Sequence, residues 1–247
     1  MRRARVAYQG AIHNAVMEEG RLRLADGRLV REEEVVWLPP FTPGTAFALG
    51  LNYADHAGEL AFEPPKEPLV FLKGPNTWVG HRGQTVKPRD VTFMHYECEL
   101  AVVIGRGGKR IARERAYDHI AGYTVANDYA FRDYLENFYR PNLRVKNRDA
   151  STPIGPCLVD RDDIPDAMNL NLRTYVNGEL RQEGCTRDMI FDIPFLVSHI
   201  SQWLTLRPGD VILTGTPRGA TPVEVGDEVV TEIEGVGRLV NFVAADG

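Results

Sequence analysis

The sequence predicts a mainly β fold with peripheral α-helices. Short β-prone runs separated by Gly, Pro and Asp-Gly or Asn-Gly turns recur along the 247 residues. Helical spacing of apolar residues is convincing only in three segments, 53–60, 113–121 and 193–204. The chain also has neither a GxGxxG nor a P-loop motif, so a nucleotide cofactor is not expected.

The strand and turn signals divide the chain into two parts. Residues 1–43 predict a small N-terminal β subdomain, with a turn at Asp26-Gly27 and a boundary marked by Pro39-Pro40. Residues 44–247 predict the main domain, whose last third is again rich in strands and Gly turns. A domain of this length can bury a sizeable core.

Each of the three predicted helices has a signal at one or both ends. Asn52 is a candidate N-cap for 53–60, and Gly122 is a candidate terminator for 113–121. Pro194 falls in the first turn of 193–204, which ends before Pro208. The apolar stripe of this last helix predicts a core-facing surface.

Composition and charge argue against several function classes. A net charge of −5 without a basic stripe makes nucleic acid and anionic membranes unexpected partners. No apolar run approaches the length of a membrane span, and no apolar segment follows the basic N-terminal residues as it would in a secretory signal. Three well-separated cysteines without a CxxC motif fit a reducing compartment, so a cytoplasmic location is expected.

Three acidic residues form the strongest chemical signal. Glu97 and Glu99 alternate on a predicted strand, which places their side chains on one face about 7 Å apart. Two carboxylates this close require a proton, a bridging basic side chain or a divalent cation. Asp128 follows another β-prone run, and the three together form a hard-oxygen set suited to Mg²⁺, Mn²⁺ or Ca²⁺. Solvated acids on a half-exposed strand are the alternative.

His56 and Glu59 lie three residues apart, on one face of the predicted 53–60 helix. A carboxylate beside an imidazole raises the pKa of the imidazole and fixes its tautomer, as in a general base. An ordinary surface contact is the alternative.

Basic residues follow Asp128 closely and predict an anionic substrate with more than one carboxylate. They are Arg132, Arg140, Arg144, Lys146 and Arg148. A solvated basic surface is the other interpretation. The turn containing Thr216 comes after an apolar run and could hold a carboxylate.

Taken in order, these segments resemble the fumarylacetoacetate hydrolase family. The motifs are residues 50–56, 68–73, 97–99, 127–133, 176–182 and 209–217, and the resemblance extends over nearly all of residues 44–242. Residues 48–56, 94–97 and 132–146 are similar to one branch, the decarboxylase/isomerase of homoprotocatechuate (4-hydroxyphenylacetate) meta-cleavage. The similarity is to the C-terminal half of its duplicated form, whereas this sequence holds a single copy.

The resemblance implies a fumarylacetoacetate hydrolase-like β-roll or mixed β-sandwich in residues 44–247, assembled as a homodimer or higher homo-oligomer. It also implies site residues in three groups. These are Glu97, Glu99 and Asp128 for Mg²⁺ (or Mn²⁺), His56, Glu59 and Lys146 for catalysis, and Asn52, Lys73, Arg132, Tyr139 and Thr216 for substrate contacts.

The implied activity is metal-dependent decarboxylation, enol–keto isomerisation, or both, of a 2-oxo or 2-hydroxydienoic di- or tricarboxylic acid in aromatic degradation. Both reactions share a dienolate, which His56 backed by Glu59, or a bound water, would protonate at carbon. An acylpyruvate- or fumarylpyruvate-type C–C hydrolase and an oxaloacetate-type decarboxylase are the alternatives. Leu135 stands where many family members carry Gln, which disfavours hydrolysis. A non-catalytic acid-binding protein is disfavoured because the catalytic and metal positions are all retained.

Overall fold

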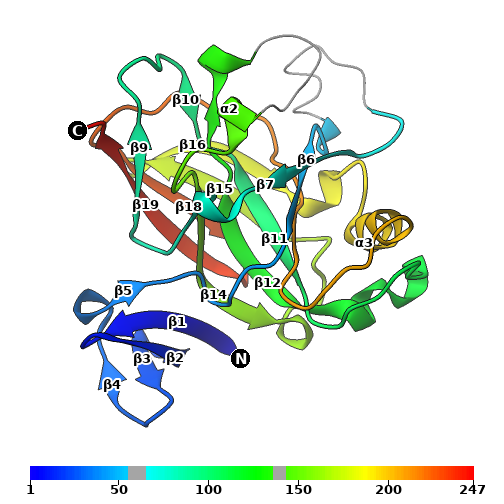
Figure 1. The fold of residues 1–247 in the computed structure, drawn as a ribbon, viewed down its shortest axis with the longest axis horizontal. Helices are drawn as coiled ribbons and strands as arrows, with labels where there is room; N and C mark the ends of the chain where they lie inside the picture. Colours follow the sequence, from blue (N-terminus) through cyan, green and yellow to red (C-terminus); the bar gives the residue numbers. More distant parts are fainter. Residues whose placement is uncertain (55–64, 136–142) are drawn as a thin grey trace.

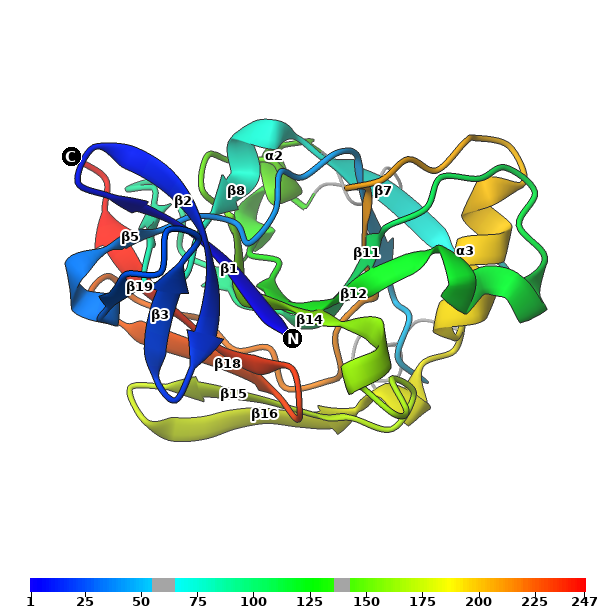
Figure 2. The same ribbon diagram turned by 90° about the horizontal axis from the view of Figure 1, so that it is seen from below.

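A computed structural model describes residues 1–54, 65–135 and 143–247, and it is mainly β, as predicted. Strands form the body of the molecule, and α3 lies at the opposite end from β1–β4 (Figures 1 and 2). The helices are α2 (Leu143–Lys146), α3 (Ile193–Ser201) and the 3₁₀ turns η1 (Glu32–Glu34), η2 (Pro75–Thr77), η3 (Arg113–His119), η4 (Arg132–Tyr134), η5 (Arg161–Asp163) and η6 (Thr186–Asp188).

The largest sheet joins the N-terminal strands to the centre of the molecule, in the order β4-β3-β2-β1-β14-β12-β11-β17-β6-β7. Two short strands lie off this path, β5 beside β1 and β8 beside β14. The strands are β1 (Arg2–Tyr8), β2 (Ala11–Glu18), β3 (Arg21–Leu24), β4 (Leu29–Val30), β5 (Val36–Trp37), β6 (Ala46–Gly50), β7 (Leu69–Lys73), β8 (Trp78–Val79), β11 (Cys98–Ile104), β12 (Ile120–Asn127), β14 (Thr152–Asp160) and β17 (Val211–Leu213).

A second sheet packs along one side of the first and has the order β16-β15-β18-β19-β9 (Figure 2). Its strands are β9 (Gln84–Lys87), β15 (Asn171–Val176), β16 (Glu179–Cys185), β18 (Glu228–Ile233) and β19 (Gly237–Ala245), and β10 (Met94–His95) pairs with β13 (Ala130–Phe131) separately. Exposed and buried residues alternate in β15, as expected for a strand with one face on the core. All seven residues of β11 are buried, because it is a central strand covered on both faces.

Residues 1–37 form a meander of short strands whose hydrophobic cluster also includes Cys157 of β14. Its first strand continues into the main sheet, where Arg2 pairs with Val159 and Arg3 with Leu158. The N-terminal strands therefore share a sheet with the central strands rather than joining them only through a linker.

Of the three predicted helices, the first falls mostly in residues 55–64, which lie outside the described residues. The other two differ from the structure, one in type and length and one in its C-terminal end. The prediction for 113–121 is wrong in type and length: the segment is a 3₁₀ helix that ends at His119 and passes directly into β12. Gly122 is therefore a strand residue. A Cβ atom there would lie 2.0 Å from the Val159 carbonyl oxygen, so close packing of β12 and β14 explains the glycine.

Helix α3 begins where predicted and ends at Ser201, three residues before the predicted end. Asp192 caps its N-terminus by accepting a hydrogen bond from the Phe195 N–H group at 2.8 Å. The residues at its predicted core positions within the helix, including Leu196 and Ile200, are buried as expected. Within the described ranges, no helix is long and apolar enough to cross a membrane.

Candidate active site

The three predicted metal ligands meet at one end of the β11–β12 pair. Cys98 pairs with Asn127 across the two antiparallel strands, which brings Glu97, Glu99 and Asp128 together. Two hydrogen bonds fix the strand ends, from the Asp128 N–H group to the Glu97 carbonyl oxygen and from the Glu97 N–H group to Asn127 Oδ1, both 3.0 Å. One carboxylate oxygen from each acid lies within 4.8 Å of the others. We call these three residues the carboxylate cluster.

Two lysines contact the carboxylate cluster. Lys146 Nζ lies 2.8 Å from Glu97 Oε2 and 2.9 Å from Asp128 Oδ2, and the side chain of Lys73 pairs with Asp128 Oδ1. The Lys73 ammonium also donates to the carbonyl oxygen of Lys146. The structure thus brings the predicted catalytic lysine and one predicted substrate contact to the cluster. It also places a basic bridge between two of the acids, one of the three solutions that the sequence left open.

The surroundings shift the pKa values of the two lysines in opposite directions. Burial lowers the pKa of Lys73, and its pairing with Asp128 offsets only part of that effect. Burial would also lower the pKa of Lys146, but attraction by Asp128, Glu97 and Glu99 outweighs it and raises the pKa. Lys146 is therefore a firmly held positive charge inside the molecule.

Glu99 differs from the other two acids because no ion pair within residues 1–54, 65–135 and 143–247 balances it. Burial, reinforced by the charges of Asp128 and Glu97, raises the pKa of this carboxyl group well above its ordinary value. Its Oε2 accepts a hydrogen bond from the Gly215 N–H group at 2.7 Å, whereas Oε1 is buried and has no partner among the residues that the structure describes. An orphaned buried oxygen beside two more carboxylates fits a site for a hard divalent cation, which would be held by Glu97, Glu99 and Asp128.

The turn after β17 is held in place by Asn52. The Asn52 amide donates to the carbonyl oxygens of Thr214 (2.8 Å) and Phe191 (3.1 Å) and accepts from the Phe191 N–H group (2.9 Å). These bonds brace the turn that presents the Gly215 N–H group to Glu99. The substrate contact that the resemblance implies for Asn52 stays a prediction.

Arg132 is held by a histidine that the sequence analysis did not select. Its Nε donates to His95 Nε2 at 2.7 Å, and His95 Nδ1 lies 2.9 Å from the Tyr96 carbonyl oxygen. Since arginine can only donate, Nε2 is the acceptor and Nδ1 carries the proton. Burial lowers the pKa of His95 to about 4, so the ring is neutral at pH 7. Its position two residues before Glu97 was the available signal.

The other basic residues after Asp128 lie against aromatic rings in the described part of the chain. The Arg144 guanidinium lies 3.9 Å from the centre of the Tyr134 ring, and that of Arg148 lies 5.2 Å from the Phe131 ring. Arg140 lies outside the described residues, and the role expected of these arginines in binding an anionic substrate stays a prediction.

Some predicted site residues cannot be placed. His56, Glu59 and Tyr139 lie in residues 55–64 and 136–142, outside the described residues, and their roles stay predictions.

Thr216 is buried in the turn after β17, and its hydroxyl group accepts a hydrogen bond from Gln182 Nε2 at 2.9 Å. Gln182 is a second buried polar residue that the sequence analysis passed over, although it lies within the 176–182 motif.

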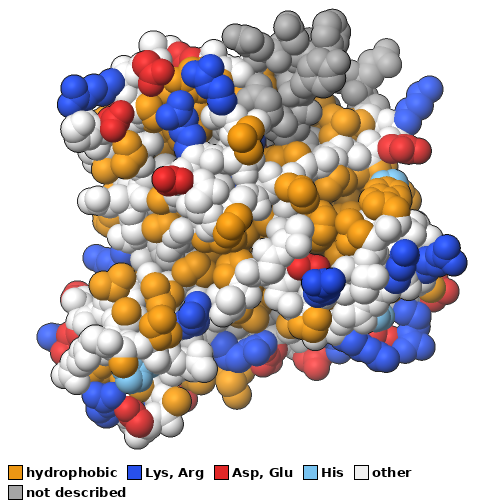
Figure 3. All heavy atoms as spheres, viewed as in Figure 1, with side chains coloured by type: hydrophobic (Ala, Val, Ile, Leu, Met, Phe, Trp, Pro, Cys, Tyr) orange, Lys and Arg blue, Asp and Glu red, His pale blue; other side chains and the backbone are white. Residues whose placement is uncertain are grey.

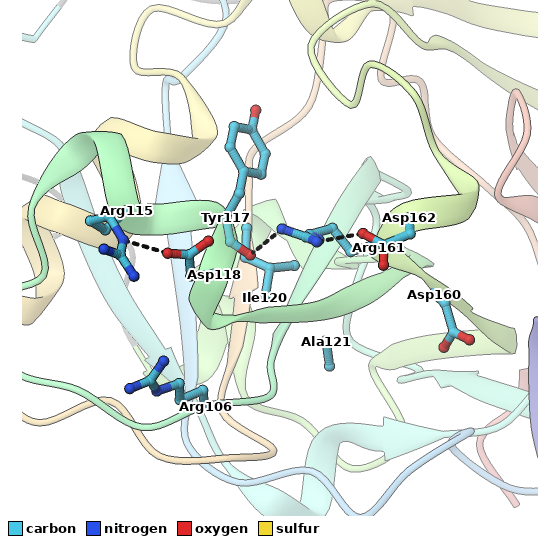
Figure 4. A pocket seen from close by; sticks show the side chains of 9 residues that line it. All are labelled: Arg106, Arg115, Tyr117, Asp118, Ile120, Ala121, Asp160, Arg161 and Asp162. Atoms are coloured by element: carbon cyan, nitrogen blue, oxygen red, sulfur yellow. Dashed lines mark hydrogen bonds and ion pairs between the residues drawn. The ribbon is translucent and has the colours of Figure 1, made fainter.

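A surface hollow of about 520 Å³ lies elsewhere, between η3, β12 and η5 (Figure 4). Its charged side chains neutralise one another: Arg115 points to Asp118 and Arg161 to Asp162. Arg161 also donates to the Tyr117 carbonyl oxygen at 3.1 Å. None of the carboxylate cluster lines this hollow, so it is separate from the candidate active site.

Comparisons with known proteins give the same family as the motifs. The family model "Fumarylacetoacetate (FAA) hydrolase C-terminal" matches residues 45–244. The chain is 56% identical over 246 residues to a 4-hydroxyphenylacetate degradation bifunctional isomerase/decarboxylase of Salmonella dublin, covering 99% of this chain and 56% of that protein. The chain thus spans about half the length of the curated relatives it matches first.

Solved structures extend this similarity to the whole fold. A 5-carboxymethyl-2-hydroxymuconate delta-isomerase from Mycobacterium smegmatis superimposes with a TM-score of 0.89 at 37% identity, covering both chains completely. A maleylpyruvate hydrolase from Sphingobium sp. SYK-6, in complex with manganese(II) and pyruvate, superimposes with a TM-score of 0.85 at 26% identity over both complete chains. By its sequence, its fold and its cluster of acids, the chain belongs to the fumarylacetoacetate hydrolase family.

Proposed function

We propose that this chain is a divalent-metal-dependent enzyme acting on a 2-oxo or 2-hydroxydienoic di- or tricarboxylic acid. The reaction is decarboxylation, enol–keto isomerisation, or both, in the degradation of aromatic acids such as 4-hydroxyphenylacetate by way of homoprotocatechuate. The observation that carries the proposal is the buried carboxylate cluster, in which Glu99 Oε1 has no partner from the described part of the chain. The name of the Salmonella dublin relative supports the reaction class.

The cation is proposed to be Mg²⁺, with Mn²⁺ as the alternative. A bound divalent cation supplies a Lewis acid that polarises the oxygens of a 2-oxo acid. The manganese complex of the Sphingobium hydrolase supports a cation of this type. A thermal-shift titration with each cation would rank them, and the protein's own carboxyl oxygens favour hard cations over zinc.

The chain's own residues would bind the substrate and stabilise negative charge. Lys146 is a buried ammonium group held among the acids, positioned to stabilise charge that develops on a substrate oxygen. Arg132, fixed by His95, would bind a second carboxylate. We assign protonation at carbon to His56 backed by Glu59, on the strength of the 50–56 motif alone.

A proton and carbon NMR time course tests the proposal. The protein is given 5-oxopent-3-ene-1,2,5-tricarboxylate in D₂O, once with Mg²⁺ and once with excess chelator. Metal-dependent CO₂ release with deuterium on the product chain is the expected result, because both reactions pass through a dienolate that takes up a proton from the site.

Acetylpyruvate in a parallel tube separates the C–C hydrolase from the proposed enzyme. Pyruvate and acetate from this tube, with the tricarboxylate unchanged, would overturn the proposal and indicate that Leu135 does not exclude hydrolysis. Oxaloacetate in a third tube reports a simple 2-oxo acid decarboxylase. No turnover of any substrate, with or without metal, would favour a binding protein.

We also propose that the enzyme is a cytoplasmic homodimer or higher homo-oligomer whose catalytic machinery lies in residues 44–247. Apolar side chains gather across the face that carries β7 and α3 (Figure 3), and Leu69 and Leu72 on the edge strand β7 are exposed. The free cysteines, all buried, are compatible with a reducing compartment. Light scattering after size-exclusion chromatography would measure the oligomeric state, and a monomer at micromolar concentration would contradict this part.

A further inference from the structure

Gln182 on β16 connects the strand of the carboxylate cluster to the turn after β17. Its Oε1 accepts hydrogen bonds from the Cys98 N–H group at 3.3 Å and from Thr174 Oγ1 at 2.9 Å. Its Nε2 donates to Thr216 Oγ1 at 2.9 Å and to the Pro217 carbonyl oxygen at 2.8 Å. Gln182 is almost completely buried, and all four hydrogen-bonding positions of its amide are used.

Two backbone groups determine which way the Gln182 amide points. The Cys98 N–H group can only donate and must face the amide oxygen, whereas the Pro217 carbonyl can only accept and must face the amide nitrogen. The group that faces the Thr216 hydroxyl is therefore an N–H donor. Rotating the amide by 180° would break both backbone hydrogen bonds.

This orientation fixes the polarity of the Thr216 hydroxyl group. One lone pair of Thr216 Oγ1 is occupied by the Gln182 N–H group, so the hydroxyl proton points elsewhere. In the described part of the chain no group accepts that proton, although the side chain is 97% buried (3% exposed). A buried O–H group without an acceptor is costly, and a ligand that supplies an acceptor would remove the cost.

The Thr216 hydroxyl belongs to the same turn as the backbone group that contacts the carboxylate cluster. The preceding residue, Gly215, donates its N–H group to Glu99 Oε2 at 2.7 Å. Gln182 occupies the position beside β11 where β17 turns away: Leu213 still pairs with Ala101, whereas the Cys98 N–H group bonds to Gln182 instead of to a strand neighbour. The turn can thus leave the sheet without leaving this N–H group unpaired.

We propose that Gln182 is a positioning residue for ligand recognition: by donating to one lone pair of Thr216 Oγ1 it leaves the hydroxyl proton for the ligand, so that the site favours a carboxylate, which accepts this proton, over an amide that turns its N–H toward the hydroxyl. This deepens the proposed function and rests on it for the substrate class, a 2-oxo acid. Gln182 itself would not touch the substrate. Its effect would pass entirely through Thr216.

Calorimetric titration of the Mg²⁺-loaded protein with oxalate and oxamate tests the proposal. Oxamate replaces one carboxylate of oxalate by an amide, so the ratio of the two affinities reports donor–acceptor selection. In Gln182→Glu the new carboxylate accepts the Thr216 proton and exposes the hydroxyl lone pairs instead. The preference for oxalate over oxamate is expected to fall about tenfold to a hundredfold, as for loss of a hydrogen bond to a charged group.

Two further variants separate positioning from general damage. In a Thr216→Val background, Gln182→Glu should leave the affinity ratio unchanged, because the hydroxyl through which it acts is gone. Gln182→Met, which removes the donor without supplying a carboxylate, should lower the ratio by a smaller factor and serves if Gln182→Glu does not fold. An unchanged ratio in the folded Gln182 variants, or an equal change in the Thr216→Val background, would overturn the inference.

The ligand titration is independent of turnover. If no 2-oxo acid is converted but the oxalate preference depends on Gln182 through Thr216, the proposed function fails and the inference about ligand selection stands. If the tricarboxylate is decarboxylated but the ratio of oxalate to oxamate affinity does not change in the Gln182 variants, the proposed function stands and the inference about Gln182 fails.

Discussion

Two groups of ion pairs in this chain have the same chemistry and opposite surroundings. In the N-terminal meander, Arg23 pairs with Glu18 at 2.6 Å, and both side chains are nearly half exposed. In the carboxylate cluster, Lys146 pairs with Glu97 at 2.8 Å, and the two side chains are only 7% and 11% exposed. Water screens the first pair, which therefore contributes little to stability. The second pair is removed from water, and the free-energy cost of desolvating its two charges can exceed the gain from their attraction. The comparison indicates that the buried charges serve binding rather than stability.

The buried group is also incompletely neutralised by its own residues. Two ammonium groups, on Lys73 and Lys146, balance two of the three carboxylates, and no ion pair among the described residues balances the third, Glu99, whose pKa is raised by burial and by the charges of Asp128 and Glu97. A divalent cation held by all three ionised carboxylates would leave the site with one net positive charge, which favours an anionic substrate. No exposed pair in the meander could respond to a cation in this way.

The largest expected effect comes from removing a cluster carboxylate. Glu97→Ala should abolish metal-dependent turnover and weaken apparent Mg²⁺ affinity by more than about a hundredfold, since even residues that only orient metal ligands are worth about 10- to 100-fold. Mg²⁺ titration followed by thermal unfolding measures the affinity without a substrate. Glu18→Ala is the matched control from the exposed pair, and it should behave as the unmodified protein. Equal losses of Mg²⁺ affinity in Glu97→Ala and Glu18→Ala would mean that the buried carboxylate cluster is not the Mg²⁺ site.

The next effect concerns stability. Lys73→Met leaves Asp128 without the partner of its Oδ1 atom in a fully buried position, and breaking one side of a buried pair costs about 3–5 kcal/mol of unfolding free energy. Chemical denaturation in the presence of chelator measures the loss. Arg23→Met, the control in the meander, should leave the midpoint unchanged within error. A Lys73→Met protein as stable as the parent would mean that the cluster is better solvated than its burial implies.

The pH dependence of the metal-free protein reports on Glu99. Because its pKa is raised, the folded state holds this proton more tightly than the unfolded state does, so the group lowers stability as pH rises above the ordinary glutamate range. The loss is at most about 1.4 kcal/mol per pH unit and stops above the raised pKa. Glu99→Gln should remove it, so the variant in chelator is more stable than the parent at pH 8 and equal to it near pH 4.

Mg²⁺ should reverse that order, since the parent gains stability from the cation and Glu99→Gln lacks a ligand for it. Parallel unfolding curves of parent and variant across pH 4–8 would show instead that Glu99 is ionised in the metal-free protein.

The carboxylate cluster could be anticipated from sequence because part of the signal is local, whereas its role as a metal site stays a prediction. Strand alternation puts Glu97 and Glu99 on one face, and the antiparallel pairing of β11 with β12, which are joined by residues 105–119, brings Asp128 to the same end of the pair. The overall β architecture followed from strand and turn signals of the same kind. Lys146 needed the family resemblance, because nothing in its own helical turn distinguishes it from Arg144.

Gln182 and His95 were missed because their partners are distant in sequence. Gln182 bonds to Cys98, 84 residues away, and His95 to Arg132, 37 residues away. A buried polar residue in a strand has no local signature, since only the folded chain decides which partner reaches it. The prediction that Gly122 ends a helix was wrong for the same reason. In the sequence, a glycine that ends a helix cannot be distinguished from one that makes room for a neighbouring strand, and here that strand is β14.

The smallest predicted effect tests whether the backbone itself sets the geometry of the buried cluster. Gly215 has φ of 88°, and an added Cβ atom would lie 3.0 Å from Asn52 Cβ. Gly215→Ala should therefore cost about 1–2 kcal/mol of unfolding free energy and move the N–H group away from Glu99. Gly226, at φ of 97° with nothing within 4 Å of an added Cβ, is the matched control for backbone strain alone.

Both variants should lose stability in thermal unfolding with chelator, and only Gly215→Ala should also lose Mg²⁺ affinity, by a factor of about ten for a displaced hydrogen bond to a cluster carboxylate. Equal Mg²⁺ affinities in the two variants would mean that Glu99 is positioned by β11 alone. The turn after β17 would then matter for Thr216 and the ligand but not for the cation, and the two halves of the site could be altered independently.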